Sequence, residues 1–496
     1  MDTIIRNGKL VIPKVGIVDG DIAIENGKIA AILSPGTACE AETVIDASGK
    51  YVFPGCIDPH VHWGCYQDMG VDTRMESAAA AIGGYTTCLQ YRRTPGPNFE
   101  PQYVQQLLDV MTPNSYIDYG LQLFITKQDH KNTVDLAVKE MGVSSFKFFT
   151  TERNVDVDIR GLRDSGIPEP YTDGFMYESM QELAKYDGNV VANFHPENIE
   201  LVETVAPKVK AAGEMGLAAW DHVRPEIAEA ETVSRLSYFS EKTGCPLYCV
   251  HISCAEAAEK IAQGKKTNLR LYGETTPHYL VLNTDSPCAE LGKVNPPLRE
   301  AHNNDKLWQY LADGTLDTVG SDNCANVRAD KAGTIWDAAC GFHGTGTMLP
   351  VLLSEGYHKG KISLERIAEV TSYNVARIFN MPEKGKLQPG TDADLVIVDL
   401  DKEKVVNAAD LKSYSDFSVF EGWNLKGWPV MTLVRGSIVA KDREIVGDAF
   451  LSVSPDHFFQ DPRNSQILIH ITFDAVRPRC RSNRPNLSVA ACHSTC

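Results

Sequence analysis

The stretch Tyr51-Val52-Phe53-Pro54-Gly55-Cys56-Ile57-Asp58-Pro59-His60-Val61-His62 decides the fold. Its apolar run is typical of a buried strand, and alternation along a strand places His60 and His62 on the same side. Two imidazoles on one side can converge on a single metal ion. An HxH pair also fits two strand-end histidines that are hydrogen-bonded to neighbours. Its meaning therefore depends on the rest of the chain.

Apolar, strand-like runs alternate with helical patterns from about residue 55 to residue 380. That alternation favours parallel β-α units over a sandwich. A length of 496 residues suits one barrel of about 250 to 400 residues with a smaller companion. We therefore expect an α/β fold, a (β/α)8 TIM-like barrel over residues 56–384. Its helices are expected to include residues 100–111, 176–185, 225–242 and 364–380.

Both ends of the central region carry short alternating strands, with turn signals at Asn7-Gly8 and Asn26-Gly27. We expect residues 1–55 and 385–450 to build one small β-sandwich domain. Beyond it the periodicity fades into a basic stretch that contains proline and asparagine. Residues 451–496 are expected to form a peripheral tail. The strand-like runs are residues 3–5, 9–12, 21–24, 394–399 and 431–439.

Composition excludes several classes of protein. The formal charge of −17, from 65 acidic and 48 basic residues, disfavours a surface that follows nucleic-acid phosphates. No run approaches the roughly 18 apolar residues of a membrane span, and the first residues lack a secretory signal pattern. Thirteen cysteines lie without CxxC pairs, which fits reduced thiols. We expect a soluble cytoplasmic protein that binds neither nucleic acid nor membrane.

Four further polar residues follow apolar runs. They are Lys147, His195, His251 and Asp322. In a barrel, groups from the ends of different strands meet at one mouth, so these residues can gather around the His60 and His62 pair. The sequence therefore predicts a site assembled from residues far apart in the chain.

Lys147 is unusual because Phe146, Phe148 and Phe149 surround it. Burial of an ammonium group lowers its pKa. A neutral amine can add carbon dioxide and become a carbamate, whose two oxygens could bridge two metal ions. The alternative is a lysine whose stem passes the aromatic rings and whose charged end reaches water.

The chain resembles the cyclic amidohydrolases, which include hydantoinases, dihydropyrimidinases, allantoinases and dihydroorotases. The resemblance runs from residue 4 to about residue 447. It rests on the stretch that ends at His62, on residues 78–87, 142–149 and 274–280, on Asn295-Pro296-Pro297-Leu298-Arg299, and on residues 389–394.

The resemblance implies a binuclear metal centre with a carbamate on Lys147, derived from carbon dioxide. His60, His62, Lys147 and Asp322 would hold one divalent ion, and Lys147, His195 and His251 would hold the other. Zinc is expected first, with manganese or cobalt as alternatives. A bridging hydroxide would attack the amide carbonyl, and Asp322 would carry its proton to the leaving nitrogen. His222 and His278 are not expected to be ligands.

The substrate is predicted less sharply. The order Gly320-Ser321-Asp322-Asn323 is similar to hydantoinases and dihydropyrimidinases, and Asn323 would then hold the imide of a small cyclic substrate. Glu152 stands where dihydropyrimidinases usually have an oxyanion-stabilising tyrosine, and a carboxylate donates only when it is protonated. Asn295 replaces a common serine at a substrate-contacting position. We therefore predict hydrolysis of a hydantoin or dihydropyrimidine type of ring, with an allantoinase-like or dihydroorotase-like activity as the alternative.

Two other functions stay open from the sequence. One is a scaffold of the same fold without catalysis, against which the presence of all six ligand types argues. The other is a single-metal deaminase-like enzyme, which would not need Lys147 as a bridge. The resemblance also implies a homotetramer.

Overall fold

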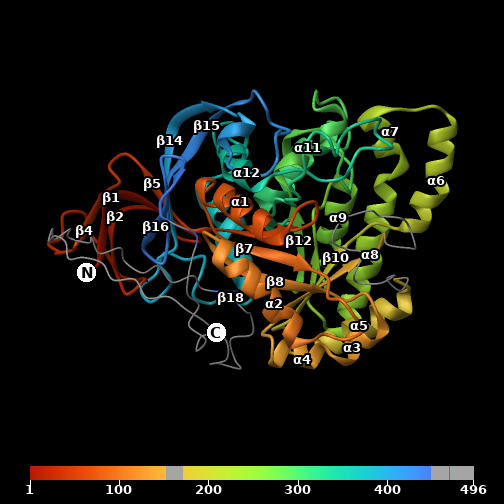
Figure 1. Cartoon of the computed structure of the whole chain (residues 1–496), viewed down its shortest axis with the longest axis horizontal. Helices are drawn as coiled ribbons and strands as arrows, with labels where there is room; N and C mark the ends of the chain where they lie inside the picture. The colour runs from red at the N-terminus through yellow and green to blue at the C-terminus, as the bar shows by residue number, and fades with distance from the viewer. Residues whose placement is uncertain (152–170, 448, 450–467, 470–496) are drawn as a thin grey trace, which may run out of the picture.

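The computed structural model describes residues 1–151, 171–447, 449 and 468–469. Eight parallel strands form the barrel, and each strand pairs with the next one along the chain (Figure 1). This arrangement confirms the predicted fold class. The strands are β6 (Cys56–Val61), β7 (Tyr85–Arg92), β8 (Asp118–Phe124), β9 (Ser145–Phe149), β10 (Val191–His195), β11 (Leu247–Cys249), β12 (Leu271–Thr275) and β13 (Thr318–Val319).

The barrel closes between its first and last strands through a short seam. Beyond β13 the chain forms an isolated parallel bridge between Val61 and Asn323. The amide of His62 donates to the carbonyl of Asn323 at 2.8 Å, and the amide of Asn323 donates to the carbonyl of His60 at 3.3 Å. These bonds bring the segment that carries Asp322 beside the HxH strand.

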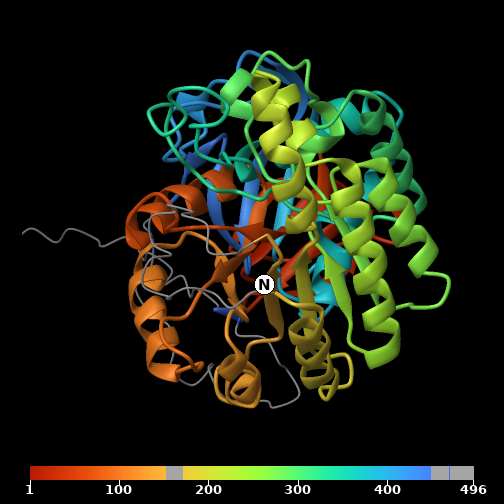
Figure 2. The ribbon, with the colours of Figure 1, turned by 90° about the vertical axis from the view of Figure 1, so that its right-hand side faces the viewer.

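Helices surround the strands in the second view (Figure 2). The predicted helices at residues 100–111, 176–185 and 225–242 are confirmed as α2 (Pro101–Met111), α5 (Asp173–Ala184) and α8 (Glu226–Thr243). Residues 364–380 fold as α13 (Leu364–Ala368), a π-helical turn (Glu369–Tyr373) and α14 (Asn374–Ile378). The other α-helices among the described residues are α1 (Met69–Ile82), α3 (Gln128–Asn132), α4 (Val134–Lys139), α6 (Ile199–Ala211), α7 (Gly216–Val223), α9 (Ala255–Gly264), α10 (Pro277–Val281), α11 (His302–Asp313) and α12 (Thr345–Val351).

The two ends of the chain share one mostly antiparallel sheet of nine strands (Figure 1). Strand β14 pairs with β5, which joins the C-terminal strands to the N-terminal ones. Apolar residues from both ends, such as Ile22 and Leu395, fill a core that belongs to this sheet. The strands are β1 (Thr3–Ile12), β2 (Gly16–Glu25), β3 (Lys28–Leu33), β4 (Thr43–Asp46), β5 (Tyr51–Pro54), β14 (Leu395–Val405), β15 (Asn424–Val434), β16 (Ser437–Lys441) and β17 (Glu444–Ile445).

The two predicted turn signals have different outcomes. Asn26 and Gly27 join β2 to β3 with φ values of 51° and 73°, as a hairpin turn requires. The predicted turn at Asn7-Gly8 is wrong, because both residues lie inside β1. The pairing of β1 with β2 shifts register between Ile5 and Gly8, and Asn7 has a φ of 60°. Asn7 and Gly8 therefore form a β-bulge within β1.

A buried ion network lies between the barrel and the terminal sheet. The amine of Lys384 contacts Asp118 at the start of β8 at 2.7 Å and Asp394 beside β14 at 2.5 Å. Arg435 also pairs with Asp118. Because each buried charge has an opposite partner, the network can hold the two parts together without leaving an isolated ion.

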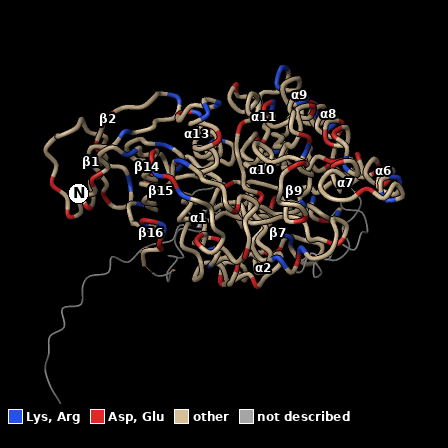
Figure 3. The backbone as a smooth tube through the Cα atoms, turned by 90° about the horizontal axis from the view of Figure 1, so that it is seen from above, with Lys and Arg blue, Asp and Glu red and all other residues tan. Residues whose placement is uncertain are grey.

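Within the described part of the chain, no helix is long and apolar enough to cross a membrane. Acidic and basic residues are interspersed along the backbone (Figure 3). Of the predicted tail, the structure describes residues 468–469, which pair antiparallel with Tyr119 and Gly120 of β8.

Candidate active site

His60, His62 and Asp322 meet at the seam of the barrel. The Nε2 atoms of the two histidines are 3.1 Å apart. Oδ1 of Asp322 lies 3.1 Å from Nε2 of His60 and 3.2 Å from Nε2 of His62. Burial opposes ionisation of Asp322, but the two histidines hold its pKa below the usual range. Three donor atoms thus surround one small volume.

A second group of donors comes from β10 and the segment after β11. Nδ1 of His195 lies 2.8 Å from Nε2 of His251. The other ring nitrogen of His195 lies 2.6 Å from Oε2 of Glu197, which also receives a hydrogen bond from Arg224 at 2.5 Å. Glu197 and Arg224 therefore fix the orientation of the His195 ring.

Lys147 lies between these two groups, in the middle of β9 rather than at its end. Its side chain is fully buried, and its amine is 4.4 Å from the centroid of the Tyr91 ring. The amine has no hydrogen-bond partner among the described residues. Burial lowers the pKa of Lys147 to about 7, although Glu274 and Asp322 act in the opposite direction. An amine with a pKa near 7 is partly neutral at neutral pH, and the neutral form can be chemically modified.

The two groups of donors form one cluster. The rings of His60 and His251 stack with centroids 5.4 Å apart, and the ring of Tyr91 lies 4.8 Å from that of His60. His251 and Asp322 have φ values of 43° and 52°, in the left-handed region that non-glycine residues rarely occupy. Strain of this kind concentrates at functional sites. The structure therefore brings together all six residues predicted at strand ends.

Glu274, at the end of β12, is a site residue to which sequence reasoning assigned no role. Its Oε1 atom lies 2.7 Å from Nδ1 of His60 and accepts the amide of His251 at 2.9 Å. Its Oε2 atom accepts the hydroxyl of Tyr248 at 2.8 Å. Burial raises the pKa of Glu274 to about 7. The carboxyl group thereby orients a histidine from each donor group.

The predicted substrate-contacting residues have varied surroundings. The side chain of Asn323 donates to Glu76 at 3.1 Å and accepts the amide of Gly344 at 2.8 Å, so its polar atoms have partners within the protein. Asn295 is half-buried and accepts the indole N–H of Trp220 at 3.2 Å. Glu152 lies outside the described residues.

The two histidines that were not expected to be ligands differ in their surroundings. His222 is on α7, is half exposed and pairs with Glu214. His278 is buried in α10, where its ring contacts those of Tyr279 and Phe342. Burial lowers the pKa of His278 to about 3, so this imidazole is neutral near pH 7.

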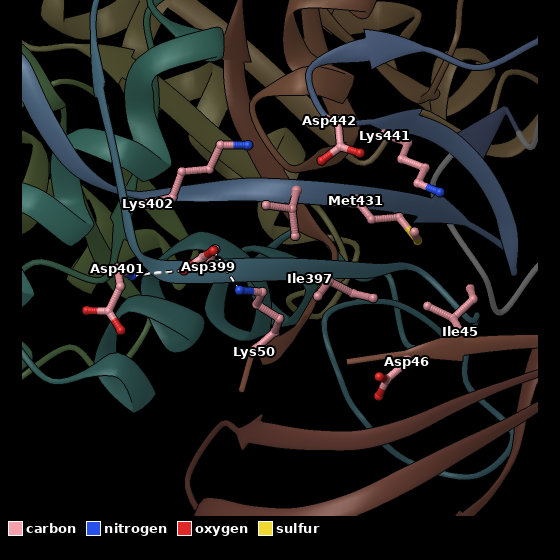
Figure 4. Close-up of a pocket in the computed structure, with 11 residues that line it drawn as sticks. Ile45, Asp46, Lys50, Ile397, Asp399, Asp401, Lys402, Met431, Lys441 and Asp442 are labelled. Carbon is pink, nitrogen blue, oxygen red and sulfur yellow. Dashed lines mark hydrogen bonds and ion pairs between the residues drawn. The ribbon is translucent and has the colours of Figure 1, made fainter. Parts of the chain in front are cut away.

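A separate cavity of about 550 Å³ lies on the terminal sheet (Figure 4). Its lining includes Lys50, which pairs with Asp399, together with apolar groups such as Ile397. None of the six donor residues lines this cavity. It therefore plays no part in the chemistry considered for the barrel.

Comparison with known proteins agrees with the barrel fold. An L-hydantoinase of Paenarthrobacter aurescens is 33% identical over 471 residues, covering 90% of this chain and 96% of that protein. An allantoinase of Desulfitobacterium hafniense (strain DSM 10664 / DCB-2) is 33% identical over 455 residues, covering 90% and 96%. The structure of dihydropyrimidinase from Brevibacillus agri superposes with a TM-score of 0.82 at 28% identity, covering 90% of this chain and 97% of that one. The model of the amidohydrolase family matches residues 51–439, and the chain belongs to this family.

Proposed function

We propose that this protein hydrolyses a ring amide bond in a hydantoin or dihydropyrimidine type of substrate. The observation that carries the proposal is the convergence of four histidines, Asp322 and an unpartnered buried lysine in the barrel. Similarity to the hydantoinase and dihydropyrimidinase named above supports this substrate class.

The donor set fits a binuclear metal centre. Imidazole nitrogens lie 3.1 Å apart in one group and 2.8 Å apart in the other, so each pair offers two nitrogen atoms close to one position. Nδ1 of His251 and the amine of Lys147 are buried without hydrogen-bond partners among the described residues. We propose His60, His62, Lys147 and Asp322 as ligands of one ion, and Lys147, His195 and His251 as ligands of the other.

Lys147 would serve both ions as a carbamate. Its lowered pKa provides a neutral amine near pH 7, which is the form that adds carbon dioxide. The new carboxylate oxygens would lie beside neutral histidines, because burial keeps the pKa values of His60 and His251 well below the usual range. Zinc is our first choice of metal, and manganese and cobalt suit the same donors.

Divalent ions, when bound, would lower the pKa of water and polarise a carbonyl group. The protein's own contribution is proton transfer and orientation. Asp322 lies within hydrogen-bonding distance of both His60 and His62, so its carboxylate can take a proton at this point and deliver it to a departing ring nitrogen. Glu274 and Glu197 keep the histidine rings in place during that transfer.

A panel of cyclic substrates tests the proposal. Metal-loaded protein would be assayed with hydantoin, 5-substituted hydantoins, dihydrouracil, allantoin, dihydroorotate and simple cyclic imides. We expect ring opening of a hydantoin or of dihydrouracil. Turnover restricted to allantoin or dihydroorotate would instead support an allantoinase-like or dihydroorotase-like activity. No turnover of any member would favour a scaffold of the same fold without catalysis.

Asp322→Ala tests the proton-transfer role in the same assay. We expect turnover to fall by a factor on the order of 10² to 10⁴ with the fold intact. Asp401→Ala is the matched control, because the side chain of Asp401 is 91% exposed. Substantial remaining activity in Asp322→Ala would refute the role.

We also propose a homotetramer in the cytoplasm, following the family resemblance. Size-exclusion chromatography with light scattering tests the assembly, and cell fractionation tests the location. A monomer that retains full turnover would contradict the first of these two proposals.

A further inference from the structure

Arg299 is a buried arginine close to the second group of donors. Only 2% of its surface is exposed. Each of the three nitrogens of its guanidinium group donates a hydrogen bond to a side chain of the described residues. These bonds reach two different segments of the chain. One segment follows His251, and the other supports the ring of His195.

The first connection leads to His251. Nε of Arg299 donates to the hydroxyl of Ser253 at 2.9 Å, and Ser253 follows His251 by two residues. Glu229 on α8 accepts the amide of Ser253 at 2.8 Å and also its hydroxyl. Nη2 of Arg299 donates to the same carboxylate at 3.1 Å. Arg299, Ser253 and Glu229 therefore form a closed ring of hydrogen bonds that fixes the backbone just after His251.

The second connection leads to His195. Nη1 of Arg299 donates to the carboxylate of Asp221 at 2.8 Å and to the carbonyl of Arg224. Both acceptors belong to the turn at the end of α7, where the amide of Arg224 donates to the carbonyl of Asp221 at 3.0 Å. The guanidinium group of Arg224 in turn donates to Glu197 at 2.5 Å, and Glu197 lies 2.6 Å from Nε2 of His195. Arg299 therefore holds the turn from which Arg224 reaches this pair.

The chemistry of the network requires an arginine at this position. A planar guanidinium group directs its donors outward in fixed directions, whereas a lysine has one nitrogen from which all its hydrogen bonds start. The four acceptors of Arg299 lie in two separate segments, so a lysine cannot bond to all of them. Two buried guanidinium groups, from Arg224 and Arg299, also face three carboxylates, which keeps each charge paired.

The first group of donors has a different support. The carboxylate of Asp58 accepts the amide of His60 at 3.1 Å and the amide of Ser321, the residue before Asp322, at 3.0 Å. None of the hydrogen bonds that Arg299 makes with the described residues reaches these groups. A change at Arg299 would therefore act on the second group of donors before it acts on the first.

We propose that Arg299 is a positioning residue that holds His195 and His251 in register and so controls the binding of the second metal ion, with little effect on the first. This inference rests on the proposed binuclear centre. Loss of a residue that orients metal ligands weakens metal affinity by about 10- to 100-fold. Arg299 supports one ligand through Ser253 and the other through Arg224, so its loss would affect both ligands of the same ion.

Zinc titration of the full-length protein tests the proposal without an activity assay. Metal-free protein would be titrated with Zn²⁺ by isothermal titration calorimetry in a buffer that contains bicarbonate. We expect two zinc ions per chain for the wild type. Arg299→Lys should bind the first ion as the wild type does and the second about 10- to 100-fold more weakly. A role in stability alone would lower the free energy of unfolding and leave both zinc affinities unchanged.

Arg366→Lys is the matched control. Arg366 likewise donates to a carboxylate, that of Glu369 at 2.7 Å, and to the carbonyls of Leu311 and Leu316 at 2.9 and 2.8 Å. Leu316 precedes β13, so these contacts lie at the opposite end of that strand from Asp322. The control variant therefore loses a comparable set of hydrogen bonds and should bind two zinc ions with wild-type affinities.

If circular dichroism shows that Arg299→Lys does not fold, each connection can be cut separately. Ser253→Ala removes the bond to the segment of His251, and Arg224→Lys disturbs the bond to Glu197. Each variant should weaken the second ion more than the first. Wild-type affinity for the second ion in both of them would overturn the proposal.

Two results with Arg299→Lys would also overturn the inference. One is the binding of both zinc ions with wild-type affinity, and the other is an equal loss of affinity for the two ions. The titration of the wild type separates these results from a failure of the proposed function. Fewer than two zinc ions per wild-type chain would contradict the binuclear centre itself, and the inference would fall with it.

Discussion

Nδ1 of His60 lies 2.7 Å from Oε1 of Glu274, and the same oxygen accepts the backbone amide of His251. One carboxyl group therefore orients a histidine from each of the two donor groups. A partner of this kind fixes the tautomer of a ligand histidine and leaves Nε2 of His60 to face the metal position.

Glu274→Gln should weaken metal binding by about 10- to 100-fold, because an amide carries no charge and has a single acceptor oxygen, so it cannot accept from His251 and from the hydroxyl of Tyr248 as the two carboxylate oxygens do. Competition with a chelator, followed by elemental analysis, measures the affinity. Glu300→Gln, at a side chain that is 65% exposed, is the control and should bind metal like the wild type. Equal metal retention in the two variants would contradict the role given to Glu274.

Lys147→Ala should lose bound metal and turnover together, since the proposed bridge disappears. Small carboxylic acids should restore part of both by occupying the space left by the lysine side chain. Lys331→Ala provides the matched control, because Lys331 is also buried but donates to the carbonyls of Lys293 and Ala339. That variant should retain its metal. Metal content comparable to wild type in Lys147→Ala would contradict the bridging role.

Lys331 also leads to a prediction about pH. Burial lowers its pKa to about 7 in the folded protein, from 10.5 in the unfolded chain. Between these values the unfolded state binds more protons, so this lysine makes stability rise as pH increases from about 7 to 10. Urea unfolding of the wild type and of Lys331→Met across this range should show a smaller rise in the variant. Identical pH dependence would show that Lys331 does not titrate in this window.

Glu76 connects the last barrel segment to the region after the terminal strand β14. It accepts hydrogen bonds from Asn323 at 3.1 Å, from Ser413 at 2.7 Å and from the amide of Tyr414 at 2.8 Å, and it lies 2.9 Å from Nδ1 of His343. Glu76→Gln should lower the free energy of unfolding by about 1 to 3 kcal/mol, because the side chain at position 76 loses its charge and one of its two acceptor oxygens, so its buried hydrogen bonds are weakened. Urea denaturation measures this change. Stability within error of the exposed control Glu300→Gln would argue that the network contributes little.

The sequence was sufficient to predict the barrel, the shared terminal sheet, the strands that carry His60 and His195, and the place of Asp322 just beyond the last strand. These depend on local alternation and on the rule that strand ends meet at one mouth. Glu274 and Glu197 received no role, because a carboxylate that orients a histidine is recognised by a tertiary contact and not by spacing. The bulge at Asn7-Gly8 was missed for a related reason: β2 continues to pair on both sides of it, which local turn chemistry does not reveal.

Asn323 illustrates the same limit at the site. Its place directly after Asp322 suggested a contact with substrate, whereas its side-chain contacts with Glu76 and Gly344 depend on helix α1 and on the segment before α12. The contact with substrate stays a prediction. Asn323→Ala would be assayed with the cyclic substrate that the panel identifies. KM should rise if Asn323 binds the ring. If Asn323 only completes the hydrogen-bond network, the free energy of unfolding should fall and KM should stay unchanged.

Metal content of the purified, active protein tests the central claim most directly. Inductively coupled plasma mass spectrometry, with protein quantified by amino-acid analysis, should find two divalent transition-metal ions per chain. Removal by a chelator should abolish ring opening, and zinc, manganese or cobalt should restore it. One ion per chain at full activity would favour a single-metal enzyme, and active protein without any transition metal would contradict the account.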